Sequence, residues 1–174
     1  MTLPFAIPVL ETSRLTLREP READLPAMTN FAMSERARFV GGPYTRDQVW
    51  GGLLYMIGHW AMRGYGWWTM IDRSSGIIVG RCGVSFPIDF PEPELGWQIY
   101  DGFEGQGFAF EAALAARAHV RANNDLGSLI SMIDSANSRS LALAKRLGAS
   151  FESMGHIKGD PCQIWRHPTT MAQI

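Results

Sequence analysis

The sequence is poor in the residues that build disulfide scaffolds and metal sites. Only two of its 174 residues are cysteines, Cys82 and Cys162, which lie far apart and have no partner at metal-ligand spacing. This excludes a disulfide-rich scaffold, and we expect a cytoplasmic chain with free thiols. Metal-ligand spacing is also missing around the histidines, which are His59, His119, His156 and His167. We therefore predict no metal site.

An excess of charge and a long apolar run are also missing. Sixteen basic and seventeen acidic residues give a formal net charge of -1, so electrostatics gives no reason to expect a nucleic acid or a membrane as partner. The apolar residues 1–10 have no basic region and contain Pro4 and Pro8, so they fit poorly as a signal peptide. No segment is long enough to span a bilayer.

The remaining composition is typical of one globular domain. A chain of 174 residues with 46% hydrophobic residues can bury a substantial core. It contains no repeat or linker, and the proline-rich residues 87–93 are interpreted as a loop within the domain. We predict a single domain over residues 1–174.

Hydrophobic periodicity indicates an α/β domain. Alternating or β-branched segments predict strands at residues 14–19, 67–72, 77–86, 95–99 and 128–134, and two more after residue 149. Helical spacing predicts helices at 45–63, 108–123 and 138–147, and a further one after Asp24, its expected N-cap. Thr45 is the predicted cap of the long helix and Gly64 its stop. We expect a mixed, mostly antiparallel, seven-stranded sheet flanked by about four helices.

A glycine-rich loop joins one predicted strand to the helix at residue 108. Gly105 and Gly107 lead into that helix, so several backbone N–H groups and the positive end of the helix dipole converge there. Such a loop can bind an anion, because a glycine lets phosphate oxygens approach the amides. Glycine is also common in ordinary strand-to-helix turns, so the loop alone leaves both interpretations open.

Dinucleotide binding is one alternative for this loop. Gly105, Gly107 and Asp134 imitate part of the Rossmann fingerprint. However, Phe110 replaces the third glycine, and hairpins precede the loop where repeated strand-helix-strand units would be expected. The sequence gives this alternative little support.

The order of motifs resembles the GNAT superfamily of N-acetyltransferases, most closely its ribosomal-protein N-terminal (RimJ/RimL-type) branch. The residues that resemble its acyl-CoA loop are ELG at 94–96, Ile99, Phe103, GQGFA at 105–109 and EA at 111–112. Residues 11–20 are similar to the opening strand of that branch, and residues 134–152 to its second cofactor motif. The resemblance covers nearly the whole chain. It departs at Glu104, where the family usually has a basic or polar residue. Since a carboxylate beside a pyrophosphate is unfavourable, we expect Glu104 to point outward.

The resemblance implies a single acyl-CoA N-acyltransferase domain that uses acetyl-CoA and no metal. The strand that ends at Ile99 would splay from residues 129–133, and a backbone N–H between residues 98 and 100 would stabilise the reacting oxyanion. No covalent enzyme intermediate is expected. The cofactor contacts implied are Gln98, Ile99, Gly105, Gln106, Gly107, Phe108, Ala109 and Asn137.

Transfer to an amine requires the neutral amine. At pH 7 a lysine amine costs roughly 4.6 kcal/mol to neutralise and an α-amine only about 1 kcal/mol, so an α-amine needs a modest base. Glu94 matches a carboxylate position used by many relatives and is the predicted base, acting through water. The alternative is that Glu94 is only a solvated glutamate at a strand end, with Glu92 nearby.

The predicted acid is Ser140. Many relatives use a tyrosine seven residues after the motif asparagine, Asn137, but this chain has Ala144 there. Ser140 lies one turn earlier on the same helical face, where the N-terminal acetyltransferase branch places its proposed acid. The alternative is a serine that only bonds local backbone, with Asn137 as an ordinary helix cap.

The acceptor is less defined. Residues 38–44 form a loop where relatives shape the acceptor site, so Phe39 and Tyr44 are predicted substrate contacts, with a plain interhelical turn as the alternative. Trp67, Trp68 and Trp97 are interpreted as core residues.

We predict an acetyl-CoA-dependent N-acetyltransferase that acts on a primary amine of a protein N-terminus or a small molecule, as a monomer or homodimer. The alternative is a non-catalytic acyl-CoA-binding or sensing protein, because Ala144 replaces the usual tyrosine.

Overall fold

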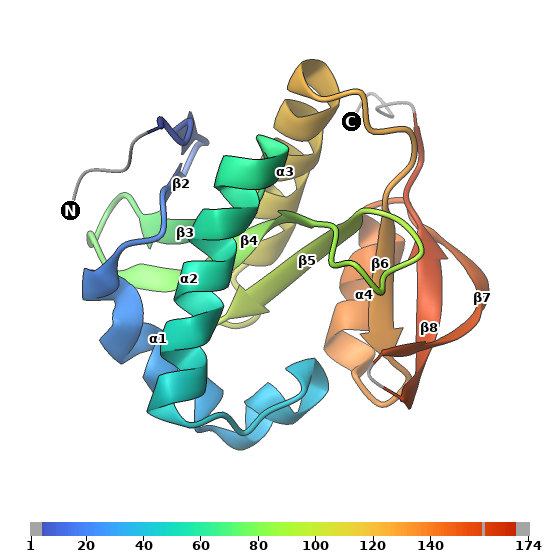
Figure 1. Ribbon diagram of the computed structural model, residues 1–174, viewed down its shortest axis with the longest axis horizontal. Coiled ribbons are helices and arrows are strands. Elements are labelled where there is room, and N and C mark those ends of the chain that lie inside the picture. Colours follow the sequence, from blue (N-terminus) through green and yellow to red (C-terminus); the bar gives the residue numbers. More distant parts are fainter. Residues whose placement is uncertain (1–4, 158, 170–174) are drawn as a thin grey trace.

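The computed structural model, which describes residues 5–157 and 159–169, contains a mixed sheet with the strand order β1-β2-β3-β4-β5-β6-β8-β7 (Figure 1). Its strands are β1 (Leu10–Glu11), β2 (Leu15–Arg18), β3 (Trp67–Asp72), β4 (Ile78–Ser85), β5 (Glu94–Ile99), β6 (Ile130–Asp134), β7 (Ser150–Ile157) and β8 (Asp160–Arg166). The seven predicted strands are all present. The eighth, β1, has only two residues, too few for an alternating pattern to reveal it.

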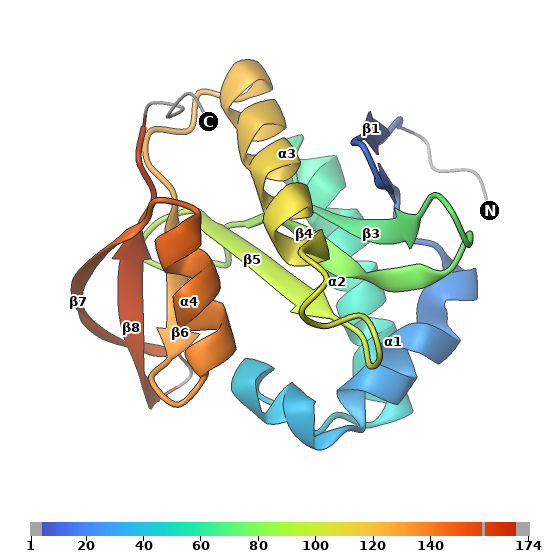
Figure 2. The ribbon, with the colours of Figure 1, turned by 180° about the vertical axis from the view of Figure 1, so that it is seen from behind.

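Helices cover both faces of this sheet. In the described part of the chain the helices are α1 (Leu25–Ala32), α2 (Arg46–Arg63), α3 (Phe108–Asn123) and α4 (Ser138–Arg146), with 3-10 segments at Glu22–Asp24 and Glu35–Val40. Figure 1 shows α2 in front of β3 and β4, and Figure 2, seen from behind, shows α3 and α4 in front of the sheet. None of these described helices is both long and apolar enough to cross a membrane.

The bounds of α2 follow from its two ends. Thr45 accepts a hydrogen bond from the Gln48 N–H at 3.3 Å, and the Gln48 side chain accepts one from the Thr45 N–H at 2.8 Å, a reciprocal capping box. Gly64 ends the helix with a φ of 72°, which favours glycine. Both predicted ends are confirmed.

Asp24 takes the predicted position before α1, but its side chain does not cap that helix. The carboxylate is buried and accepts hydrogen bonds from the Arg18 guanidinium at 2.6 Å, the Thr69 hydroxyl at 2.7 Å and the Arg21 N–H at 3.0 Å. Asp24 therefore ties α1 to β2 and β3, because a buried carboxylate requires charged or hydrogen-bonding partners.

The main core lies between the sheet and α3. Alanines at the buried face of α3 let its backbone approach the strands closely, and the surrounding side chains are fully buried. Members of this core include Leu15, Trp68, Val79, Leu95, Ala112, Ala113, Ala116 and Val120.

The feature that positions the site is a gap in this sheet. Described neighbours pair antiparallel except β5 and β6, which run parallel and share a single register position, Glu94 opposite Ile130. Beyond that position the two strands diverge (Figure 1). A backbone edge of β5 is thereby left without a strand partner.

Candidate active site

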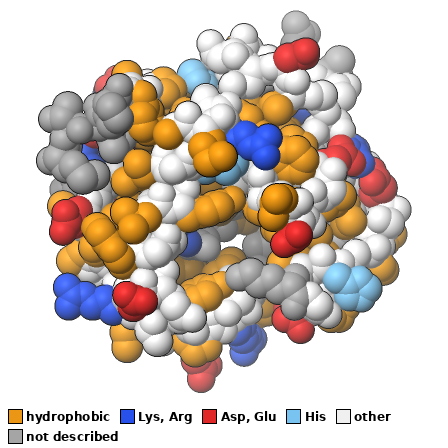
Figure 3. Space-filling view, viewed as in Figure 1, with side chains coloured by type: hydrophobic (Ala, Val, Ile, Leu, Met, Phe, Trp, Pro, Cys, Tyr) orange, Lys and Arg blue, Asp and Glu red, His pale blue; other side chains and the backbone are white. Residues whose placement is uncertain are grey.

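Two connected cavities occupy the gap between β5 and β6. The larger, about 950 Å³, extends from the glycine-rich loop to α4, and the smaller, about 290 Å³, reaches β8 and Glu94. Both are lined by Trp97, Asn137 and Ser140, so these residues stand where the cavities meet. Figure 3 shows the molecule hollowed near the centre of the view, with hydrophobic side chains at the edge of the hollow.

The glycine-rich loop has the backbone geometry of an anion site. Gly102, Gly105 and Gly107 have φ values of 90°, 73° and 82°, in the left-handed region that glycine adopts without strain. Gly107 is the N-cap of α3 and has no side chain to satisfy the first amides of the helix. Within residues 5–157 and 159–169, the N–H groups of residues 105–110 have no hydrogen-bond acceptor. An anionic group such as a pyrophosphate fits these donors and the helix dipole.

Glu104 does not point outward, contrary to the expectation from the sequence. Its carboxylate lines the larger cavity, accepts a hydrogen bond from the Gly102 N–H at 2.8 Å and pairs with the Arg36 guanidinium at 2.9 Å. Arg139 lies 3.8 Å from the same carboxylate. Because two arginines face Glu104, its charge is largely compensated at the site.

The outer side of the loop is bonded to the turn between β1 and β2. Arg14 donates to the Gln106 carbonyl at 2.8 Å and to Glu111 at 2.8 Å, and it stacks over the ring of Phe108 at 4.8 Å. Glu111 also accepts a hydrogen bond from the Thr12 hydroxyl at 2.5 Å. The glutamate of the loop motif therefore has a structural role, which its place in the sequence did not reveal.

The free edge of β5 presents alternate residues to the gap. The Tyr100 N–H donates to the Val79 carbonyl at 2.9 Å, so by the two-residue period of an antiparallel ladder Gln98 also bonds toward β4. The N–H groups of Trp97 and Ile99 then face the gap. The Ile99 carbonyl accepts a hydrogen bond from Arg36 at 2.9 Å. Of the three residues 98–100, Ile99 is the one whose N–H faces the gap.

Gln98 lies beside the gap, but its side chain is hydrogen-bonded to Arg81. Gln98 lines both cavities, and its side-chain amide oxygen accepts a hydrogen bond from the Arg81 Nε at 2.7 Å. A role for Gln98 in cofactor binding stays a prediction.

Glu94 lies half-buried in the smaller cavity, at the point where the strands separate. Burial raises its pKa from the usual 4.5 to about 7, although the hydrogen bond from the Met132 N–H at 3.1 Å acts in the opposite direction. A carboxylate with a pKa near neutrality suits a general base at physiological pH.

Ser140 and Asn137 lie on the first turn of α4. The Asn137 side chain accepts the Ser140 N–H at 3.2 Å, so Asn137 is the helix cap. The Ser140 oxygen accepts a hydrogen bond from the Trp97 indole at 3.2 Å, which leaves its own proton free to be donated. Ala144 is fully buried in a cluster with Ile133, so a tyrosine at this position would have no room.

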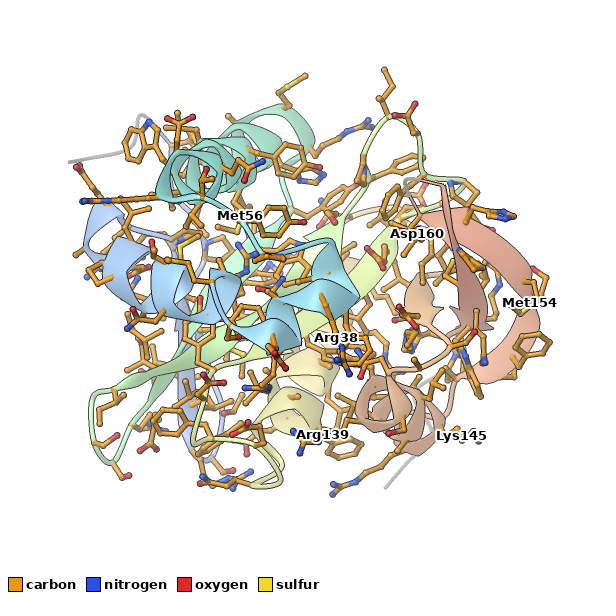
Figure 4. The ribbon with its side chains drawn as sticks, turned by 90° about the horizontal axis from the view of Figure 1, so that it is seen from below. Arg38, Met56, Arg139, Lys145, Met154 and Asp160 are labelled. Atoms are coloured by element: carbon orange, nitrogen blue, oxygen red, sulfur yellow. The ribbon has the colours of Figure 1, made fainter. Side chains whose placement is uncertain are left out.

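The predicted acceptor loop is only partly at the site. Phe39 lines both cavities, whereas Tyr44 lines neither and donates from its hydroxyl to the Val40 carbonyl. The prediction that Tyr44 contacts the acceptor is therefore not supported. Arg38, which was not among the predicted site residues, lines both cavities. Its side chain extends from the 3-10 segment Glu35–Val40 toward α4 (Figure 4).

The prediction that the tryptophans are core residues was incomplete, because two of them also line a cavity. Trp97 packs against the core as predicted, yet it lines both cavities, and Trp67 and Phe90 line the smaller one. The position of Trp97 between the motif residues Gly96 and Ile99 is a signal that could have identified it. Alternation along β5 gives the face of a side chain but not whether a cavity lies there.

Known proteins share this arrangement. The model of the acetyltransferase (GNAT) domain matches residues 14–150. An acetyltransferase from Agrobacterium tumefaciens str. C58 is 35% identical, with 97% of this chain and 98% of that chain covered and a TM-score of 0.88. A Bordetella pertussis protein described as a GNAT-family acetyltransferase is 26% identical, with 93% and 100% covered and a TM-score of 0.80.

A more distant likeness concerns the fold. The ribosomal L7/L12 alpha-N-protein acetyltransferase RimL, solved in complex with coenzyme A, is 18% identical, with 92% of this chain and 97% of that chain covered and a TM-score of 0.75. The family match spans most of the chain and contains the glycine-rich loop, the gap between β5 and β6, and α4. The protein therefore belongs to the GNAT family of acetyl-CoA-dependent acetyltransferases.

Proposed function

We propose that this acetyltransferase transfers the acetyl group to a primary amine that enters through the smaller cavity. The observation that carries the proposal is the position of Glu94, a carboxylate with a pKa of about 7 that lines the smaller cavity. It lies near the residues that line both cavities, which supports a role as the base. Ser140 lies at the junction. The acceptor and the donor can then meet from opposite sides of the gap.

The larger cavity would hold acetyl-CoA, which supplies the activated acetyl group. The free amides of residues 105–110 suit its pyrophosphate, and the open edge of β5 suits its extended arm. Glu94 would take a proton from the amine through water, the Ile99 N–H would stabilise the negative charge on the carbonyl oxygen, and Ser140 would protonate the departing sulfur.

An α-amine suits this site better than a lysine amine. Its neutral form costs only about 1 kcal/mol at pH 7, so a base with a pKa near 7 is strong enough to accept its proton. The sequence resemblance to the RimJ/RimL-type branch supports the same choice. The proposed acceptor is either a protein N-terminus or a small molecule with an α-amine.

Release of the free thiol from acetyl-CoA with a panel of peptides, amino acids and polyamines tests the function. We expect release that depends on an amine and is fastest with an α-amine. Binding of acetyl-CoA by calorimetry without release on any amine would instead favour the sensing protein, the alternative that Ala144 raised.

The loop prediction concerns Gly107. Replacing it by glutamate adds a side chain at a φ of 82° and a negative charge where the amides converge, so the Kd for acetyl-CoA should rise about tenfold or more. Gly107→Ala is the matched control, since it introduces the backbone strain without the charge. Equal Kd values for the two variants by calorimetry would contradict an anion site at the loop.

A further inference from the structure

A chain of buried polar side chains runs from α3 to the point where β5 and β6 separate. Arg117 of α3, His167 after β8 and Ser131 of β6 are 4%, 1% and 2% exposed. The Arg117 guanidinium lies 3.3 Å from His167 Nδ1, and His167 Nε2 lies 2.8 Å from the Ser131 hydroxyl. The Ser131 hydroxyl in turn lies 2.6 Å from the Leu95 carbonyl of β5. None of these side chains has a role in the proposed reaction.

The donor and acceptor capacity of each group fixes the direction of the hydrogen bonds from Arg117 to Leu95. A guanidinium can only donate, so His167 Nδ1 is the acceptor and the ring proton is on Nε2. Burial, followed by repulsion from Arg117, lowers the pKa of His167 to about 3 and keeps the ring neutral. Nε2 donates to the Ser131 oxygen, so the single hydroxyl proton of Ser131 must point to the Leu95 carbonyl.

That carbonyl is one of the two groups that a continued sheet would join. The Ile130 N–H donates to the Pro93 carbonyl at 3.1 Å, and the next N–H that β6 would donate in a continued parallel ladder is that of Met132, to the Leu95 carbonyl. Here the Met132 N–H donates to the Glu94 carboxylate at 3.1 Å, and the Leu95 carbonyl accepts from Ser131. Two side chains therefore satisfy the two backbone groups that the separation of the strands sets free.

We propose that Ser131, oriented by His167 and Arg117, is a positioning residue that keeps β5 and β6 apart, so that the Trp97 and Ile99 N–H groups stay available to the acetyl thioester. Arg117 reinforces the arrangement, because it also donates to the Leu147 carbonyl at the end of α4 at 2.8 Å. The gap is a feature of the protein alone. Only its use by the thioester rests on the proposed function.

The test compares three variants in calorimetric binding of acetyl-CoA. Ser131→Ala removes the donor to the Leu95 carbonyl, which can then accept the Met132 N–H and close the gap. We expect a Kd about tenfold higher than that of the parent protein, the equivalent of one hydrogen bond. Ser131→Thr keeps the hydroxyl and should stay within about threefold.

Ser85→Ala is the matched control, because Ser85 is a buried serine of the neighbouring strand β4 that lines neither cavity. It should leave the Kd unchanged. If Ser131→Ala weakens binding no more than Ser85→Ala does, or if Ser131→Thr loses as much as Ser131→Ala, the proposal is wrong. Melting temperatures measured alongside confirm that each variant is folded.

A second measurement needs no ligand. Nitrogen NMR of the free protein should show His167 neutral, with its proton on Nε2, at pH 5 to 8, and Ser131→Ala should change the shift of that nitrogen. A proton on Nδ1, or titration near the ordinary pKa of about 6.5, would overturn the direction of the chain. Neither measurement needs an acceptor, so both can be interpreted even if no amine in the panel is acetylated.

Discussion

Replacing Glu94 by glutamine is expected to lower kcat/KM by roughly 10²- to 10³-fold, in the lower part of the range for a lost general base. Glutamine keeps an oxygen that can accept the Met132 N–H, so the separation of β5 and β6 should persist and acetyl-CoA should still bind. The loss would therefore come from the missing proton acceptor. Initial rates with an amine from the panel measure it, and calorimetry of acetyl-CoA checks that the cofactor site is intact.

The pH dependence gives the sharper result. The base acts when ionised, and the pKa of Glu94 is about 7, so kcat/KM of the parent protein should fall as the pH drops below about 7. In Glu94→Gln the part of this fall that is due to Glu94 should be absent, and only the fall due to protonation of the α-amine, whose pKa is about 7.8, should remain. The variant Glu92→Gln, which changes the neighbouring glutamate outside both cavities, should lose less than about twofold and keep the fall. A fall in Glu94→Gln as steep as in the parent protein would assign the base to another group.

The same shift predicts an effect on stability. The pKa of Glu94 is higher in the folded protein than the usual 4.5, so the folded state binds the proton more tightly. Its contribution is fully present below about pH 4.5 and is lost as the pH rises through about 7. Glu94→Gln should thus melt at a higher temperature than the parent protein at pH 8, and this difference should shrink as the pH is lowered toward 4.5.

Replacing Ser140 by alanine should lower kcat by roughly 10²-fold, with little change in the Kd for acetyl-CoA. The structure separates this role from helix capping, because Asn137 caps α4 and the Ser140 oxygen has the Trp97 indole as its partner. Asn137→Ala should lose about 1 kcal/mol of stability. Ser140→Ala should melt close to the parent temperature.

The leaving group tests the chemistry of Ser140 directly. Acyl donors whose thiol has a lower pKa need less protonation, so the loss caused by Ser140→Ala should shrink with them. Ser135→Ala, a change at an exposed serine before α4 that lines neither cavity, serves as the control. Equal losses with both kinds of donor would show that Ser140 positions the acetyl group and donates no proton.

Local interactions explain what was predictable in the fold and the site. The ends of α2 follow from Thr45 and Gly64, since capping and a positive φ depend on residues within one helical turn. The glycine-rich loop before α3 was identified for the same reason, because left-handed backbone at Gly105 and Gly107 is encoded by glycine itself. Hydrophobic periodicity predicted the order of the elements, and the family resemblance supplied the separation of β5 and β6.

The sequence by itself thus determined the four α-helices, the longer strands and the glycine-rich loop. The tertiary structure alone decided the pairing of Glu104 with Arg36, the half-buried setting of Glu94, the position of Tyr44 outside the cavities and the path from Arg117 to Leu95. The hydroxyl of Ser131 and its carbonyl partner are 36 residues apart in the chain. Such contacts, and the pKa values that depend on them, arise from burial and packing between distant segments, which no local pattern encodes.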